Sequence, residues 1–204
     1  MYRRIRIPLG IALVLSLLFP VTTYGTTVLA FGADDLIARA DHIFHGVCTD
    51  RHVTKDDRGR LVTHYSFVVT ETLKGKHEVV VKFTLPGGQK DGRATVIPGL
   101  SQHGIGDEVI LFLGASEATS PFRFPIGLDQ GLYRVRTDAQ GDKRVKRSLN
   151  GLRLIDKGAK DKPQLASFPE NLPIRGFKQL LRDRLQKLKD KPAPTRPKKP
   201  VDRR

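Results

Sequence analysis

Apolar and polar residues alternate along much of the middle of the chain, which is the pattern of β-strands that bury one face. Residues 61–73 show it best, with one face made of Leu61, Thr63, Tyr65, Phe67, Val69 and Leu73 and the other of Val62, His64, Ser66, Val68, Thr70 and Thr72. The stretch before them reads IFHGVCTD, and Gly59 lies in the polar turn between the two. Residues 43–73 are therefore predicted to form one long hairpin.

Further strands are predicted at residues 26–31, 77–83 and 104–114, which read TTVLAF, HEVVVKF and GIGDEVILFLG. Residues 131–147 are predicted to form a second hairpin that turns at Gln140 and Gly141. Residues 85–93 read LPGGQKDGR and are predicted to be a flexible hairpin loop, because they join two strands and do not open a helix that would bind phosphate.

Two segments have helical periodicity. A short early helix is predicted where four apolar residues recur at helical spacing, namely Leu36, Ile37, Ala40 and Ile43. A second helix is predicted over residues 173–189, with an apolar stripe of Ile174, Phe177, Leu180, Leu181, Leu185 and Leu188. The expected fold is mainly β: a small OB-like curled sheet or barrel of six or seven strands, with a short N-terminal helix and a C-terminal amphipathic helix.

The first residues resemble a secretory signal, because MYRRIRIP is charged and LGIALVLSLLFPV is a short apolar run. Export by the general secretion route, to the periplasm or beyond, is expected, with cleavage after Gly25; cleavage after Ala30 and retention as an anchor are the alternatives. The expected organisation is a signal peptide at 1–25, a β-barrel-like domain at 26–172, the helix at 173–189 and a disordered Pro/Lys/Arg-rich tail at 190–204.

Positive charge gathers at the end of the chain. Of 36 basic residues, 12 lie in residues 175–204 together with only 3 acidic ones. Candidate contacts to an anionic surface are Arg175, Lys178, Arg182, Arg184, Lys187, Arg196, Lys198, Lys199, Arg203 and Arg204. The helical stripe either docks on the sheet or lies on an anionic membrane. A cell-surface polymer is the other anionic partner considered; nucleic acid is not expected, because the body lacks a basic stripe interleaved with aromatic residues.

The stretch DHIFHGVC places two histidines and the chain's one cysteine at metal-like spacing. On a strand, however, His42 and His45 point to opposite faces, and His42 lies about 20 Å from Cys48. No single metal site is predicted there. Cys48 is expected to be a small buried residue, with an intermolecular disulfide or a reactive thiol as alternatives. His52 and His64 flank the hairpin in positions where they can meet across it; they are interpreted as exposed surface residues, with a metal site as the alternative.

Catalytic motifs are absent from the sequence. The segment SQHGIGDE places Ser101, His103 and Asp107 close together along the chain. The residues of a catalytic triad, however, usually come from separate secondary-structure elements. The sequence contains no GxSxG, HExxH or GxxxxGK[ST] pattern. No catalytic residue, cofactor or metal ligand is predicted.

Four sequence segments, in this order along the chain, resemble those of a known family: DDLIARADHIFHGVC, YSFVVTETLKG, GIGDEVILFLG and LDQGLYRV. Over residues 26–137 the chain resembles a module of exported bacterial proteins, found alone or beside matrixin-like metallopeptidase domains, and is remotely similar to netrin-like and tissue-inhibitor-of-metalloproteinase OB barrels. Those inhibitors use an N-terminal cysteine to contact the zinc ion, whereas this mature chain is expected to begin at Thr26 or Phe31. The resemblance implies fold, export and a non-catalytic role.

The function predicted from these features is that of an exported, non-enzymatic binding module. Its barrel contacts a protein partner, a secreted peptidase being one candidate, and its basic tail attracts an anionic surface. The alternative is an exported enzyme whose site the fold assembles from His64, His103 and scattered acids.

Overall fold

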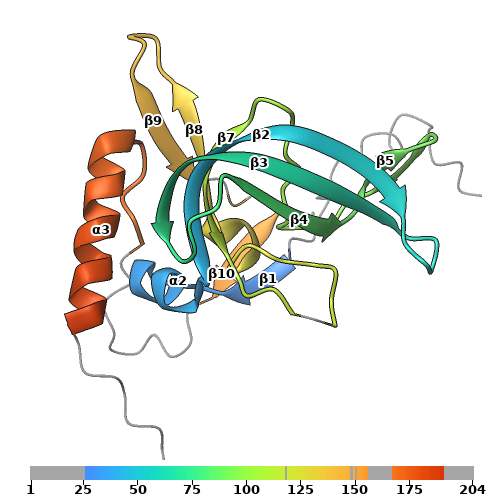
Figure 1. Ribbon diagram of the computed structural model, residues 1–204, viewed down its shortest axis with the longest axis horizontal. Helices are drawn as coiled ribbons and strands as arrows, with labels where there is room; N and C mark the ends of the chain where they lie inside the picture. The colour runs from blue at the N-terminus through green and yellow to red at the C-terminus, as the bar shows by residue number, and fades with distance from the viewer. Residues whose placement is uncertain (1–25, 118, 148, 150, 156–166, 191–204) are drawn as a thin grey trace, which may run out of the picture.

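The computed structural model describes residues 26–117, 119–147, 149, 151–155 and 167–190. Its main element is a curled antiparallel sheet of seven strands in the order β11-β9-β8-β7-β2-β3-β4 (Figure 1). These strands are β2 (His42–Lys55), β3 (Leu61–Lys74), β4 (Val80–Pro86), β7 (Glu108–Leu113), β8 (Leu132–Thr137), β9 (Lys143–Arg147) and β11 (Leu172–Pro173). The predicted fold, a mainly β curled sheet with a C-terminal helix, is confirmed.

Both predicted hairpins are present. β2 and β3 are joined by a turn in which Asp56 N–H donates to Arg60 O at 2.9 Å and Gly59 takes a positive φ of 73°. β8 and β9 turn at Gly141, which has a φ of 86°, and the Asp138 carboxylate accepts from the Gln140 and Asp142 amides. Glycine fits both turns because a side chain disfavours positive φ.

One cluster of buried side chains lies inside the curl, and we call it the curl cluster. β4 and β7 are separated by two strands in the sheet, yet both contribute to this cluster, so the sheet wraps around it. Its members are Phe44, Cys48, Tyr65, Phe67, Val81, Phe83, Leu85, Leu100, Val109, Leu111, Leu113 and Leu132. Except for Leu100, which lies outside the strands, these residues lie on strands for which the sequence predicts a period of two.

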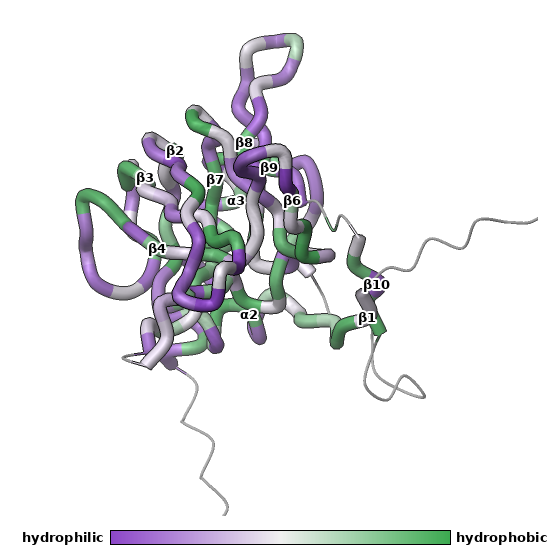
Figure 2. Tube along the Cα trace, turned by 90° about the vertical axis from the view of Figure 1, so that its right-hand side faces the viewer, coloured by the Kyte–Doolittle hydropathy of each residue, from purple (hydrophilic) through white to green (hydrophobic). Residues whose placement is uncertain are grey.

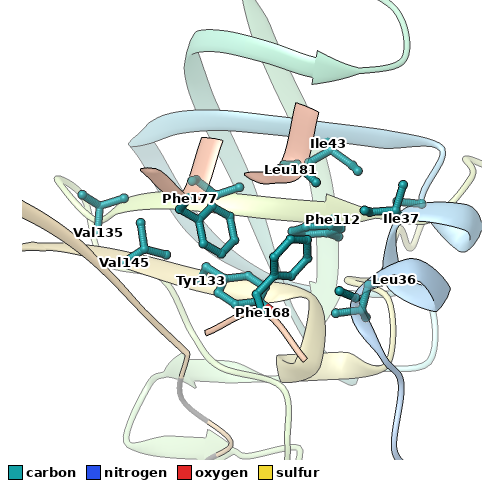
Figure 3. Packing of buried hydrophobic residues seen from close by; sticks show 13 residues of the cluster. Leu36, Ile37, Ile43, Phe112, Tyr133, Val135, Val145, Phe168, Phe177 and Leu181 are labelled. Atoms are coloured by element: carbon teal, nitrogen blue, oxygen red, sulfur yellow. The ribbon is translucent and has the colours of Figure 1, made fainter. Parts of the chain in front are cut away.

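A second cluster, the helix-covered cluster, occupies the opposite face of β7, because Ile110 and Phe112 alternate with the curl residues. It is covered by α2 (Ala33–Arg39), α3 (Ile174–Asp190) and Phe168 (Figure 3). All six residues of the predicted C-terminal stripe contact this cluster, and Phe177 and Leu181 are fully buried. The helical stripe therefore docks on the sheet. Figure 2 shows hydrophobic stretches gathered in the body of the molecule.

The face predicted for Leu73, near the end of β3, is wrong. Val69 contacts the curl cluster, but Leu73 contacts the helix-covered cluster on the other side. The ladder with β2 shifts between His45 and Gly46, where Thr70 is an extra residue, and again between Ile43 and Phe44. A β-bulge of this kind breaks the period of two, so the side chains after it change face.

The loop predicted at residues 85–93 contains part of a small hairpin made of β5 (Gly88–Lys90) and β6 (Arg93–Thr95). The predicted hairpin loop thus contains a short strand ladder that the sequence did not indicate. The predicted first strand is present as β1 (Thr26–Leu29), which pairs in parallel with β10 (Leu152–Ile155). A 3₁₀ turn (Leu128–Gly131) leads into β8.

The curl does not close into a barrel through a strand ladder within the described residues. Instead, the segment 122–125 spans part of the open side: Arg123 N–H donates to Thr84 O of β4 at 3.3 Å, and Gly114 N–H, just after β7, donates to Phe124 O at 2.9 Å. Phe122 and Phe124 of this segment also line a groove on the surface.

Candidate functional site

A groove of about 480 Å³ opens where the β2–β3 hairpin tip, the end of β4, β6 and the segment 122–125 meet. Its apolar surface is formed by Leu61, Val62, Pro86, Ile97, Phe122 and Phe124. The Phe122 and Phe124 rings lie 6.0 Å apart, and Phe124 is 39% exposed. Ligand sites commonly have volumes of about 300–1,000 Å³, so the groove is large enough for side chains of a partner.

Two adjacent glycines shape the wall of this groove. Gly87 and Gly88 have φ values of 95° and 135°, which L side chains rarely adopt. A Cβ on Gly87 would lie 2.8 Å from Thr95 O, and one on Gly88 would lie 2.5 Å from the Thr63 Oγ1. Only glycine lets the chain turn this closely from β4 into the β5–β6 hairpin.

Buried polar groups hold that turn in place. The Thr63 hydroxyl, fully buried, donates to Gly87 O at 2.7 Å, and Gly87 N–H donates to Leu61 O at 2.8 Å. Beneath them, the Tyr65 hydroxyl donates to Gln102 Oε1 at 2.7 Å. Since these groups are satisfied by one another, the groove wall is preorganised.

The rim of the groove is basic. It carries Lys55, Arg60 and Arg93, and among its described lining residues there is no carboxylate, histidine or cysteine. Arg60 is oriented by Asp56, whose Oδ2 accepts from Arg60 Nε at 2.7 Å; this hydrogen bond holds the pKa of the Asp56 carboxyl below its ordinary value. An apolar floor with cations around it suits a ligand that carries both an apolar group and carboxylates.

Two other hollows lie beside α3, with volumes of about 400 and 440 Å³. The first is lined by charges of both signs, Asp34 and Asp183 with Arg184 and Lys187. The second also mixes signs, since Asp142 lies beside Lys143 and Arg175. Neither combines an aromatic surface with charge of one sign, so the groove is the stronger candidate.

Three of the candidate anionic-surface residues on α3 are already ion-paired to the body. Lys178 Nζ lies 2.8 Å from Glu71 Oε2, Arg182 contacts the same carboxylate, and Arg184 Nη1 lies 2.9 Å from Asp34 Oδ1. Arg175 and Lys187 are exposed. The remaining candidates, Arg196, Lys198, Lys199, Arg203 and Arg204, lie outside the described residues.

His45 belongs to the same charged network. Its Nε2 lies 2.7 Å from Glu108 Oε1, and Lys178 Nζ donates to its Nδ1 at 2.9 Å. Because an ammonium only donates, Nδ1 is the acceptor and the proton is on Nε2. Burial, and then the Lys178 charge, lower the pKa of His45. Burial opposes ionisation of Glu71, but hydrogen bonds from Lys178 and Arg182 outweigh it and lower the pKa of its carboxyl. His45 is thus a structural link between the sheet and α3.

The other residues of DHIFHGVC lie where the strand prediction places them. His42 contacts the Phe44 ring at 5.4 Å between centroids, on the curl side, opposite to His45. Cys48 is buried in the curl cluster, and burial raises the pKa of its thiol. No group of three potential metal ligands occurs in the part of the chain that the structure describes.

Within the described residues, the side chains of Ser101, His103 and Asp107 do not hydrogen-bond to one another. Ser101 Oγ donates to Asp129 Oδ2 at 2.6 Å, and Asp107 Oδ2 pairs with Arg134 Nη1 at 2.9 Å. His103 is buried edge-on against the rings of Tyr65, Phe67 and Phe83. Burial lowers its pKa to about 3. These residues do not form a triad.

His64 lies on the opposite face of β3 from Tyr65, so it is not brought together with His103. Its ring stacks on His52 at 4.7 Å between centroids, as expected for facing residues. Both ring nitrogens of His64 lie 2.8 Å from a hydroxyl, of Thr54 and of Thr84. The site that the alternative enzyme hypothesis requires is not assembled from these two histidines.

The sequence prediction missed the groove, although Pro121 to Pro125 reads PFRFP. Two aromatic residues between prolines, outside any strand pattern, are a signal of apolar surface in a loop. The segment lies far in sequence from β4, which it contacts, so its role depends on the tertiary fold.

Comparisons with protein-family models, with curated proteins and with solved structures find no match to this chain. No helix within the described ranges is long and apolar enough to cross a membrane.

Proposed function

We propose that this chain is an exported, non-enzymatic binding module that holds an extended segment of a protein partner in the groove. The observation that carries the proposal is the combination, in one groove, of an aromatic apolar surface with Lys55, Arg93 and the Asp56-paired Arg60, and with no carboxylate among its described lining residues. Aromatic residues and arginine are the groups most enriched where protein interfaces gain their affinity.

The partner segment is expected to place an apolar side chain between carboxylates. The apolar side chain contacts Phe122 and Phe124, and its burial contributes affinity. The carboxylates meet Lys55, Arg60 and Arg93, which sets orientation and speeds association. A secreted peptidase is the candidate partner suggested by the resemblance to modules found beside metallopeptidase domains.

The C-terminal region adds attraction to an anionic surface. Since Lys178, Arg182 and Arg184 pair with acidic residues of the body, the exposed charges of α3 that serve this role are Arg175 and Lys187. Most of the attraction is assigned to the basic residues that follow Asp190.

A displayed library of random short peptides tests the groove. The chain from Thr26 to Arg204 is used for selection, and the enriched peptides are measured by fluorescence anisotropy against Lys55→Glu/Arg93→Glu. The matched control is Lys146→Glu/Lys189→Glu, which changes net charge equally at exposed positions away from the groove.

The proposal expects enriched peptides that combine acidic with apolar residues, bind the control like the wild type and lose about tenfold or more in affinity for the groove variant. Failure to enrich any peptide, or equal binding to both variants, would overturn it.

A further inference from the structure

The outer edge of β4 is the second feature that points to an interaction. One side of β4 pairs with β3 from Val68↔Val80 to Val62↔Pro86. On the other side, the hydrogen bond found among the described residues is at Thr84, whose carbonyl accepts from Arg123 N–H. The first half of β4 therefore presents an open strand edge.

The hydrogen bonds fix which backbone groups face outward. Val69 N–H donates to Val79 O at 2.9 Å, so residues 79, 81 and 83 turn their polar groups toward β3. Val80, Lys82 and Thr84 turn theirs away, which agrees with the bond from Arg123 to Thr84. Val80 and Lys82 thus offer an N–H and a C=O each to another strand.

The side chains at this edge are unusually apolar for an exposed strand. Val79 is 71% exposed, Val80 40%, and Val68, which lies directly across from Val80, 42%. Exposed edge strands with β-branched residues favour pairing with another strand, unless charges oppose it. The charges beside these valines are Glu78 and Lys82.

We propose that this edge pairs with the same edge of a second copy of the chain, antiparallel and with the two-fold axis at Val80. In that register Val80 faces Val80 of the second copy, and Glu78 faces Lys82 of the second copy twice, by symmetry. Val68 and Val80 of the two copies then form one apolar row across the joined sheets.

Neighbouring registers lack this complementarity. With the axis at Val81, Lys82 faces Val80; with the axis at Lys82, two lysines face each other; with the axis at Val79, Lys82 faces Lys76. Like charges directly opposite each other destabilise strand pairing. The register at Val80 also stops short of Thr84, where Arg123 occupies the edge.

The groove lies at the other end of β4, around Pro86 and Gly87, about 20 Å from Val80 at strand spacing. A dimer of this kind leaves both grooves open. It presents two of them on one rigid body, which would strengthen binding to a partner with repeated segments.

Charge reversal tests the register. Sedimentation equilibrium of the chain from Thr26 to Arg204 is measured over a wide concentration range for the wild type, Glu78→Lys, Lys82→Glu and the double variant. Each single variant sets like charges opposite each other at two places, so its dimer affinity is expected to fall by about tenfold or more, and the double variant is expected to recover it.

An equimolar mixture of the two single variants is the most informative sample. In the heterodimer, residues 78 and 82 of the two copies again carry opposite charges at both contacts. Recovery of dimer in the mixture is the expected result, and circular dichroism of each variant reports its folding. A monomeric wild type, equal affinities for all variants, or a mixture no tighter than its components would overturn the proposal.

Discussion

The two faces of the central sheet are buried in different ways. The curl cluster is enclosed mainly by strands from residues 42–137, and the period of two assigns most of its members. The helix-covered cluster is completed by α2, Phe168 and α3, which come from the two ends of the described chain. The curl cluster has an aromatic centre that includes His103, whereas the helix side has a charged network at its margin.

The unequal covering of the two faces determines which surface is left for binding. The helices cover β7, β8, β9 and the adjoining end of β2, and Figure 1 shows α3 and the β5 end of the molecule far apart in that view. The groove and the β4 edge lie on the part of the sheet that the helices do not cover. Both proposed interactions therefore use surface that the helix-covered cluster leaves free.

The largest expected effect is loss of an aromatic side chain from the curl cluster. Phe67 is fully buried and stacks on Phe83 at 5.5 Å between centroids. Phe67→Ala is expected to lower the free energy of unfolding by about 3–5 kcal/mol, measured by chemical denaturation. Phe124→Ala, at the partly exposed groove, is the control and should cost much less. A loss below about 1 kcal/mol for Phe67→Ala would contradict the burial of this face.

Acid is expected to weaken the curl side through His103. Its folded pKa is about 3 and its ordinary value is 6.5, so the folded state binds fewer protons between these values. Its contribution is full above pH 6.5 and is lost by about 1.4 kcal/mol per pH unit as the pH falls toward 3.

His103→Phe removes this dependence while keeping a ring of similar shape. Burial also lowers the pKa values of His42, His45 and His64, but these groups are present in both proteins. The difference between the two unfolding curves, measured from pH 7 to pH 4, therefore isolates His103. Parallel curves would contradict its burial as a neutral ring.

On the helix side, Lys178→Met is expected to cost about 1–3 kcal/mol, because the Nδ1 of buried His45 and one oxygen of Glu71 lose their donor. The comparison is with Lys187→Met, an exposed position on the same helix, which should change stability by less than about 0.5 kcal/mol. Equal effects in thermal unfolding would show that the network does not fasten α3.

The smallest effect is expected from removal of residues 191–204, which lie outside the described part. Their sequence has no apolar period, so truncation after Asp190 should leave the melting temperature nearly unchanged. Binding to vesicles that contain anionic lipid should fall, and the fall should shrink at high salt. A large drop in melting temperature would contradict the role given to this segment.

The sequence predicted β1, β4, β7, both long hairpins and the α3 stripe, because each rests on local periodicity or a local turn. It did not predict the short strands β5, β6, β10 and β11. It misplaced Leu73, since the bulge at Thr70 is set by pairing with β2, and it left β5 and β6 unassigned within a flexible hairpin loop. The candidate groove could not be predicted from the sequence, because Phe122, Pro86 and Arg93 come together only when the sheet curls. The role of His45 depends on Lys178, far away along the chain.

The most direct test of the account is to map where a selected acidic and apolar peptide binds. The measurement is the change in backbone amide signals of the ¹⁵N-labelled chain on titration with that peptide. If the peptide binds in the groove, the largest changes are expected at residues 55–62, 86–97 and 122–124. Changes centred on α3, or on the face that carries His52 and His64, would contradict the groove as the binding site.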